Sequence, residues 1–183
     1  MVRFGYITGT QVYYEGGSPN EIIKYGVLAE KYGFNSFWFG NHLRIYAGQF
    51  SETFVALTAV GLNTKRMFLS PWVIDSFGRH PAYIAQTMAS LDLLTKGRMY
   101  LGIGGGEGIN NIPYGITFKK PLTRLKEAIE VIKLLWSSSQ EKLVNYQGQI
   151  FTLKDTYLSP KPLQKPHPPL YIGALRRRTR ELV

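Results

Sequence analysis

Three segments of the chain combine residue types that could do chemistry. They are Asn41-His42, Trp72 to Asp75, and Gly104 to Glu107, and each follows an apolar run typical of a β-strand. Histidine and glutamate transfer protons in many enzymes, and glycines after a strand let backbone N–H groups approach a flat or phosphorylated ligand. We therefore take His42 and Glu107 as the candidate catalytic residues.

Each segment also has a purely structural interpretation. A single histidine is more often structural, the glycines at 104–106 could form only a tight turn, and Trp72 could simply pack in a core. The glycine segment is not the dinucleotide-binding fingerprint, because Glu107 occupies a position where that motif requires glycine. It also lacks the Lys-Ser/Thr ending of a P-loop.

The apolar runs recur at a regular spacing. They begin at Phe4, Ser36, Met67 and Arg98, which are 32, 31 and 31 residues apart. A strand–helix unit repeated at this length is typical of a parallel β/α barrel, in which the chemistry lies in the loops that follow the strands. We therefore expect His42 and Glu107 to face one pocket. A five-stranded doubly wound sheet is the alternative fold.

Capping residues and apolar periodicity predict the remaining elements. Ser18, Pro19 and Glu21 form a capping box for the first helix, which Gly33 ends. A closed barrel needs eight units and about 250 residues, and this chain supplies about five. We expect residues 1–183 to be a single domain, the N-terminal part of a truncated barrel. Its further elements are helices from about Ser51 to Leu62, from Pro81 to Leu94 and from Pro121 to Trp136, an inserted hairpin at Val144–Phe151, and a fifth strand at Leu170–Ala174.

Composition narrows the functional classes. The chain has no cysteine, which excludes disulfides, thiolate metal sites and a cysteine nucleophile, and its three histidines lack the spacing of metal ligands. No apolar run is long enough to span a bilayer, and no signal-peptide core is present, so we expect a cytoplasmic protein that does not bind membranes. The net charge is +10, and six Lys and Arg residues lie among the last 23 residues. Because no recognition motif accompanies them, we do not expect nucleic acid as a partner.

Several segments, in order along nearly the whole chain, resemble the bacterial luciferase-like superfamily. The resemblance is to the branch that uses the deazaflavin coenzyme F420, of the methylenetetrahydromethanopterin reductase and F420-dependent dehydrogenase type. The matching pieces are Glu30 to Ser36 with Gly40-Asn41-His42, Arg79-His80-Pro81, Leu91 to Arg98, Leu101 to Glu107 with Asn110, Pro113 to Ile116, Pro121 to Trp136, and Pro169 to Ala174.

The resemblance implies a (β/α)8 barrel with a flavin-type cofactor in its mouth. In that branch a non-prolyl cis peptide in a bulge after strand three cradles the deazaflavin ring, and the bulge maps onto Trp72-Val73. Two departures are Asn41, where aspartate is usual, and Tyr46, where the sugar-phosphate dehydrogenases have tryptophan; the second argues against that substrate. The residues that we expect to bind the cofactor are Asn41, Trp72, Val73, Asp75, Gly105, Gly106, Asn110, Gly173 and Ala174.

The function that follows from the resemblance is hydride transfer between C5 of F420 and a carbon of a small substrate. His42 and Glu107 would handle the protons, and the arginines from Arg176 to Arg180 could bind the anionic tail of F420. The alternatives are an FMN-dependent monooxygenase of the same fold, a non-catalytic remnant that binds flavin or a partner subunit, and a basic nucleic-acid binder. We expect a homodimer or another homo-oligomer.

Overall fold

The computed structural model describes residues 2–8, 20–43, 52–174 and 177–180. The expectations for Ser18, Pro19, Tyr46 and Arg176 lie outside these residues. The strands are β1 (Gly5–Thr8), β2 (Ser36–Gly40), β3 (Phe68–Trp72), β4 (Leu101–Gly104), β5 (Val144–Gln147), β6 (Thr152–Thr156) and β7 (Leu170–Gly173). The helices are α1 (Glu21–Lys31), α2 (Thr53–Asn63), α3 (Pro81–Leu94), α4 (Gly108–Asn111), the 3₁₀ turn η2 (Ile112–Tyr114), α5 (Pro121–Ser137) and α6 (Arg177–Arg180).

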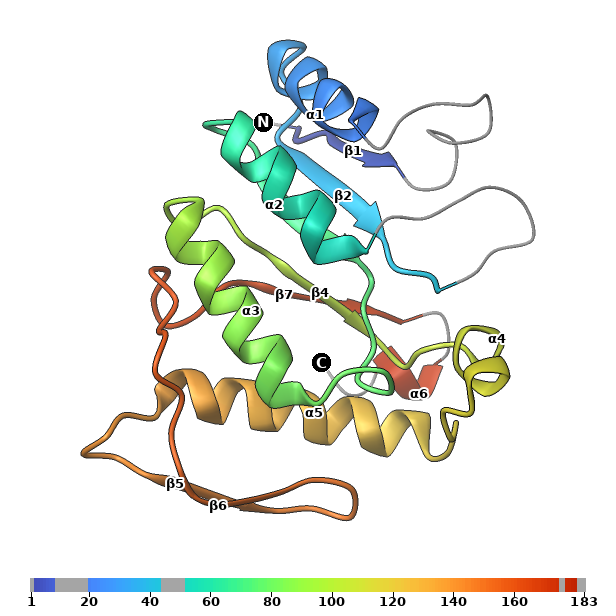
Figure 1. The fold of residues 1–183 in the computed structure, drawn as a ribbon, viewed down its shortest axis with the longest axis vertical. Helices are drawn as coiled ribbons and strands as arrows, with labels where there is room; N and C mark the ends of the chain where they lie inside the picture. The colour runs from blue at the N-terminus through green and yellow to red at the C-terminus, as the bar shows by residue number, and fades with distance from the viewer. Residues whose placement is uncertain (1, 9–19, 44–51, 175–176, 181–183) are drawn as a thin grey trace.

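Five parallel strands follow one another in chain order. β1 pairs with β2, β2 with β3, and β4 with β7, all in parallel. Two isolated parallel bridges, Leu69 to Met99 and Ile74 to Ile103, link β3 to β4. In Figure 1 the helices α1, α2, α3 and α5 follow one another in the same order as the strands. This sequential order differs from that of a doubly wound sheet, whose strand order reverses at a switch point.

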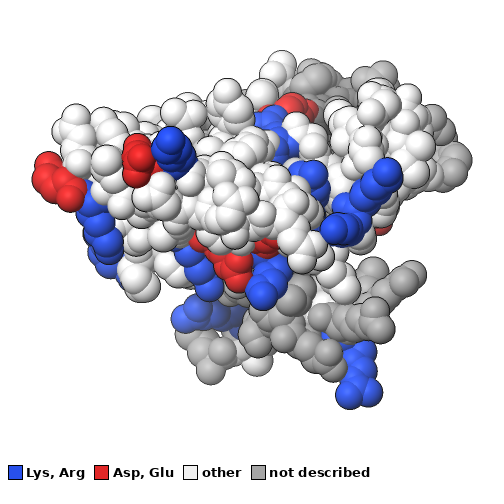
Figure 2. Space-filling view, turned by 90° about the horizontal axis from the view of Figure 1, so that it is seen from below, with Lys and Arg blue, Asp and Glu red and all other residues white. Residues whose placement is uncertain are grey.

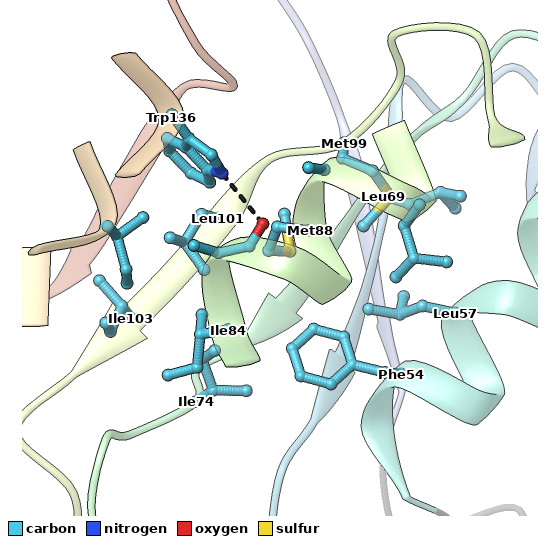
Figure 3. Close-up of a cluster of buried hydrophobic side chains, with 14 of the residues drawn as sticks. Phe54, Leu57, Leu69, Ile74, Ile84, Met88, Met99, Leu101, Ile103 and Trp136 are labelled. Carbon is cyan, nitrogen blue, oxygen red and sulfur yellow. Dashed lines mark hydrogen bonds between the residues drawn. The ribbon is translucent and has the colours of Figure 1, made fainter. Parts of the chain in front are cut away.

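The two faces of the sheet differ sharply in burial. Side chains on the face that meets the helices, such as Phe37, Leu69 and Leu101, are fully buried. Figure 3 shows this core, where α2 contributes Phe54 and Leu57, α3 contributes Ile84 and Met88, and Trp136 of α5 donates its indole N–H to the Ala85 carbonyl oxygen at 3.0 Å. On the opposite face Ile7, Trp72 and Tyr171 are 53%, 52% and 46% exposed. The described helices therefore cover one face, as in the wall of a β/α barrel.

Helix α3 has ordinary capping at both ends. His80 caps α3, because its Nδ1 accepts a hydrogen bond from the Ala82 N–H, and Pro81 occupies the first turn, where no N–H donor is needed. Gly97, with φ of 79°, follows the end of α3, in a conformation that glycine adopts without strain. The predicted α3 and α5 are confirmed to within one residue.

The structure corrects two predicted boundaries. Arg98 was expected to begin the fourth strand, but β4 begins at Leu101. The Arg98 guanidinium instead donates hydrogen bonds to the carbonyl oxygens of Gly61, Thr64, Met67 and Thr95, and so ties the ends of α2 and α3 to the start of β3. The hairpin was expected within 144–151, but its second strand, β6, lies beyond Phe151, because that buried aromatic side chain forms part of the turn.

Charged residues are spread over the surface seen in Figure 2. On that face Lys and Arg are separated by uncharged side chains and by Asp and Glu, and they do not form one continuous basic patch. Within the described ranges, no helix has the length and apolarity needed to cross a membrane.

Candidate active site

The carboxyl ends of β2, β3, β4 and β7 open into one cavity of about 620 Å³. This is the edge of the sheet where parallel β/α proteins place their ligands. The residues predicted from the sequence that line it are Asn41, His42, Trp72, Val73, Asp75, Gly105, Gly106, Glu107, Asn110, Gly173 and Ala174. The structure therefore brings both candidate catalytic residues and all nine candidate cofactor-binding residues together.

His42 and Glu107 meet through an asparagine. The Asn110 amide nitrogen lies 2.8 Å from His42 Nδ1 and 3.0 Å from Glu107 Oε2. The direct separation of His42 Nδ1 and Glu107 Oε2 is 3.9 Å, too long for a hydrogen bond. Glu107 precedes α4 and Asn110 lies on it, so one short helix positions both residues opposite the end of β2. The Glu107 side chain is 62% exposed and can reach a ligand in the cavity.

The floor of the cavity is a bulge after β3. The peptide bond between Trp72 and Val73 is cis, as the resemblance implies. The Val73 side chain lies over Gly104 and Gly173, where an added Cβ would approach it to 2.7 Å and 3.1 Å. Because neither glycine has a side chain, Val73 can lie directly against the backbones of β4 and β7.

Asp75 connects the bulge after β3 to the glycine segment and α4. One carboxylate oxygen accepts the Phe77 N–H at 2.8 Å, and the other lies 3.3 Å from the Asn111 amide nitrogen. Asn111 also donates to the Glu107 carbonyl oxygen at 2.9 Å. Gly106, with φ of 73°, packs against Asp75, and a Cβ there would lie 2.7 Å from the carboxylate. These contacts fix the glycine segment relative to the bulge after β3.

Asn41 is positioned by Thr53, the first residue of α2. The Thr53 hydroxyl lies 2.7 Å from the Gly40 carbonyl oxygen and 3.1 Å from Asn41 Oδ1, and Thr53 is fully buried. The end of β2 is therefore fixed where it enters the site. A second cavity, of about 470 Å³, shares Asn41, His42, Asp75 and Asn110 with the first and extends toward the Glu52–Arg79 ion pair.

Sequence reasoning missed three residues of the site. Tyr171 and Ile172 line the cavity, and Asn111 hydrogen-bonds to Asp75. Gly104, which belongs to the predicted glycine segment but was not among the expected cofactor-binding residues, also lines the cavity. Alternation along β7 could have indicated Tyr171, since it shares a face with Gly173. For Asn111, the only signal was its place beside Asn110 after the glycine segment. Arg177 and Arg180 lie on α6, and no arginine is found among the described residues that line the cavity.

A sequence model of the luciferase-like monooxygenase family matches residues 2–183. The chain belongs to this family. Among luciferase-like relatives, the F420-dependent glucose-6-phosphate dehydrogenase of Microbacterium testaceum is 35% identical over 180 residues, 94% of this chain and 51% of that protein. The 5,10-methylenetetrahydromethanopterin reductase of Archaeoglobus fulgidus is 34% identical over 84% of this chain and 43% of that protein. The chain spans about half the length of the curated relatives it matches.

Solved luciferase-like structures share the fold. An F420-dependent secondary alcohol dehydrogenase, in complex with an F420–acetone adduct, superposes with a TM-score of 0.79 at 28% identity over 93% of this chain and 51% of that one. The monooxygenase RslO1 from Streptomyces bottropensis superposes with a TM-score of 0.84 at 22% identity over 93% of this chain and 53% of that one. The second likeness concerns the fold alone.

Proposed function

We propose that the protein is an F420-dependent oxidoreductase that transfers hydride to or from a small substrate. The observation that carries this proposal is the cluster of His42, Asn110 and Glu107 beside a cavity floored by glycine backbone and the Trp72–Val73 bulge. Two groups that can transfer protons next to a site for a flat ring are what hydride chemistry on a polar substrate requires.

The cavity suits a flat cofactor. Trp72 and Tyr171 expose about half of their surface beside it, and Gly104, Gly105 and Gly106 leave room for a ring to approach the backbone. Asn110 is 7% exposed, and its Oδ1 has no hydrogen-bond partner among the described residues. A buried acceptor left unpaired costs about 1–3 kcal/mol, so an N–H donor on a bound ring would stabilise the site.

Sequence identity to the compared proteins favours F420 over FMN as the cofactor. The glucose-6-phosphate dehydrogenase described above is named as F420-dependent, at 35% sequence identity, and the alcohol dehydrogenase structure, at 28%, contains an F420 adduct. An FMN-dependent monooxygenase is the second candidate, because a Baeyer–Villiger monooxygenase in complex with FMN superposes with a TM-score of 0.79. Its identity to this chain is only 19%.

Each residue has a stated task in this proposal. Trp72, Val73, Gly105, Gly106, Gly173 and Ala174 would hold the ring, and Asn41 and Asp75 would line its polar edge. His42 and Glu107 would hydrogen-bond to the substrate and to the polar part of the cofactor and would exchange protons there. The bound deazaflavin would supply or accept the hydride. We further propose that residues 1–183 form one domain whose five parallel strands are the first five of a β/α barrel, supported by their sequential order.

Titration of the purified chain with F420 and, separately, with FMN tests the cofactor. We expect saturable changes in F420 absorbance and weaker or absent changes with FMN. Binding of FMN alone would overturn the first choice in favour of the monooxygenase. Binding of neither, with stable association to a longer homologue, would favour the non-catalytic alternative.

Substitution of the proton-handling residues tests the mechanism. His42→Ala and Glu107→Gln should each lower F420-dependent turnover about a hundredfold or more, while F420 affinity changes much less. His167→Ala and Glu141→Gln are matched controls, because both residues lie outside the cavity lining. Unchanged turnover in both site variants would remove His42 and Glu107 from the catalytic assignment.

A further inference from the structure

The Asn110 amide links two groups that can exchange protons. Its nitrogen bears two hydrogens and lies within hydrogen-bond distance of two acceptors, Glu107 Oε2 at 3.0 Å and His42 Nδ1 at 2.8 Å. Asn110 itself is 7% exposed, so its amide is shielded from bulk water, whereas the side chains of His42 and Glu107 are 34% and 62% exposed. One amide can therefore satisfy both neighbours at once.

Glu107 determines which way the amide faces. An ionised carboxylate only accepts hydrogen bonds, so it requires the nitrogen of Asn110 rather than the oxygen on its side. Turning the amide over would place Oδ1 about 3.0 Å from Oε2, with two acceptors in contact. No described residue donates to Oδ1 where it now lies, so Glu107 is the group that fixes the orientation.

The second amide hydrogen then determines the state of the imidazole. Nδ1 of His42 must use its lone pair to accept this hydrogen, so the proton of the neutral ring is on Nε2. We propose that Asn110 is a positioning residue that transmits the charge of Glu107 to His42 and fixes its Nε2–H tautomer. Because the direct His42–Glu107 separation is 3.9 Å, the hydrogen-bonded link between them among the described residues is the Asn110 amide.

This tautomer has a chemical consequence, which rests on the proposed function. A neutral imidazole with its proton on Nε2 offers a hydrogen-bond donor there, and no base. Such a group stabilises negative charge that develops on a carbonyl oxygen when hydride is added to its carbon. The cofactor of the proposed function would supply the hydride, and water would protonate the resulting alkoxide. The substrate class that fits is therefore a carbonyl compound that is reduced, and a hydroxyl group that must lose its proton to His42 fits poorly.

The tautomer can be measured without cofactor or turnover. Long-range ¹⁵N–¹H correlation spectra of the chain labelled with ¹⁵N-histidine distinguish Nδ1–H from Nε2–H, at a pH where the rings are neutral. The chain has three histidines, and the other two serve as references. His80 Nδ1 accepts the Ala82 N–H and requires Nε2–H, whereas His167 Nδ1 lies 2.9 Å from the Pro168 carbonyl oxygen and requires Nδ1–H.

We expect His42 to give the Nε2–H pattern in the wild type. A free histidine side chain also favours this form, so the comparison between wild type and the variants is the decisive test. Asn110→Asp replaces the donor with an acceptor and should shift His42 to Nδ1–H. Asn110→Ala should give a mixture of the two tautomers. Glu107→Gln should also give a mixture, although residue 107 lies beyond hydrogen-bond distance of His42. Asn111→Ala, which removes the neighbouring buried amide, should leave His42 unchanged.

Unchanged His80 and His167 signals would report an intact fold in each variant. An Nδ1–H pattern for wild-type His42, or the wild-type pattern in both Asn110 variants, would overturn the inference and leave the proposed function standing. Failure to bind F420 would overturn the proposed function and leave the measured tautomer unaffected.

Discussion

Among single residues outside the site, Glu127 of α5 makes an important stabilising contact. Its buried carboxylate accepts the backbone N–H groups of Gln149, Ile150 and Phe151 at 2.8–3.0 Å. Burial raises the pKa of the Glu127 carboxyl, but the three N–H donors and Arg124 outweigh it, so the pKa lies below its usual value. The ionised form therefore anchors the turn of the hairpin to α5.

Glu127→Gln should destabilise the fold by about 2 kcal/mol, since a neutral amide oxygen leaves buried N–H donors unpaired. The folded pKa lies below the ordinary value of 4.5, so this stabilisation is fully present above pH 4.5 and is lost as the pH falls through the folded pKa. Urea unfolding against pH measures it. We expect the gap between wild type and variant to narrow below pH 4.5.

Glu130→Gln is the matched control, because Glu130 lies three residues further along α5 and its side chain is 44% exposed. Its carboxylate is partly exposed; among the described residues it accepts the Tyr146 hydroxyl and lies 3.9 Å from the Lys126 ammonium, so its loss should cost about 1 kcal/mol or less. Equal losses in the two variants at every pH would contradict the role of the three N–H donors.

Individual site residues were predictable where their type and position both carried information. His42 and Glu107 are reactive types placed directly after strands, and the structure brings both to one cavity. The mediating contact of Asn110 could not be derived from sequence, because it depends on the path of α4 across the end of β2. The same holds for Glu127, whose partners lie more than twenty residues further along the chain.

At the scale of elements, the spacing of β4 and β7 beneath the Val73 bulge depends on glycine. Gly104→Ala would set a Cβ 2.7 Å from Val73 Cγ2, so the Val73 side chain must shift. We expect about a tenfold loss of F420 affinity, equivalent to about 1.4 kcal/mol, and a shift of the Val73 methyl resonances. Titration and a methyl spectrum measure the two effects.

Gly105→Ala is the adjacent control. The nearest atom to a Cβ at that position is Pro121 Cβ, at 3.9 Å, which is an ordinary contact. Its Val73 resonances should stay in place. If Gly104→Ala also leaves them in place, the proposed support of the bulge by these two strands is wrong.

Elements were predictable where periodicity and capping agreed. α3 and α5 have prolines at their starts and apolar residues at helical spacing, and both are confirmed. The errors arose where a side chain served tertiary contacts. Arg98 precedes an apolar run, but its guanidinium bonds four backbone carbonyls, and Phe151 was assigned to a strand but fills the core beneath the turn.

For the whole molecule, the two ends of the sheet have different tasks. At the amino ends of the strands, Glu30 accepts the N–H groups of Lys65, Arg66 and Met67, and Arg98 ties helix ends together. At the carboxyl ends the side chains of the candidate site converge. The strand–helix repeat in the sequence predicted that the site would lie at the carboxyl ends of the strands. It could not predict how much of the inner face the described helices leave uncovered, because that depends on what lies against it.

The exposed inner face leads to a prediction about self-association. In the described chain β1 and β7 each pair with one strand, and Ile7, Trp72 and Tyr171 are about half exposed on that face. Open strand edges beside apolar surface promote pairing between chains, and a lysine on an edge strand opposes it.

We therefore expect sedimentation velocity to show association that rises with protein concentration, and Ile7→Lys to shift the distribution toward monomer. Val55→Lys adds the same charge at a 66% exposed position on α2 and should leave association unchanged. A wild-type chain that stays monomeric, or two variants that behave alike, would contradict the role of the sheet edge and with it the expected homo-oligomer.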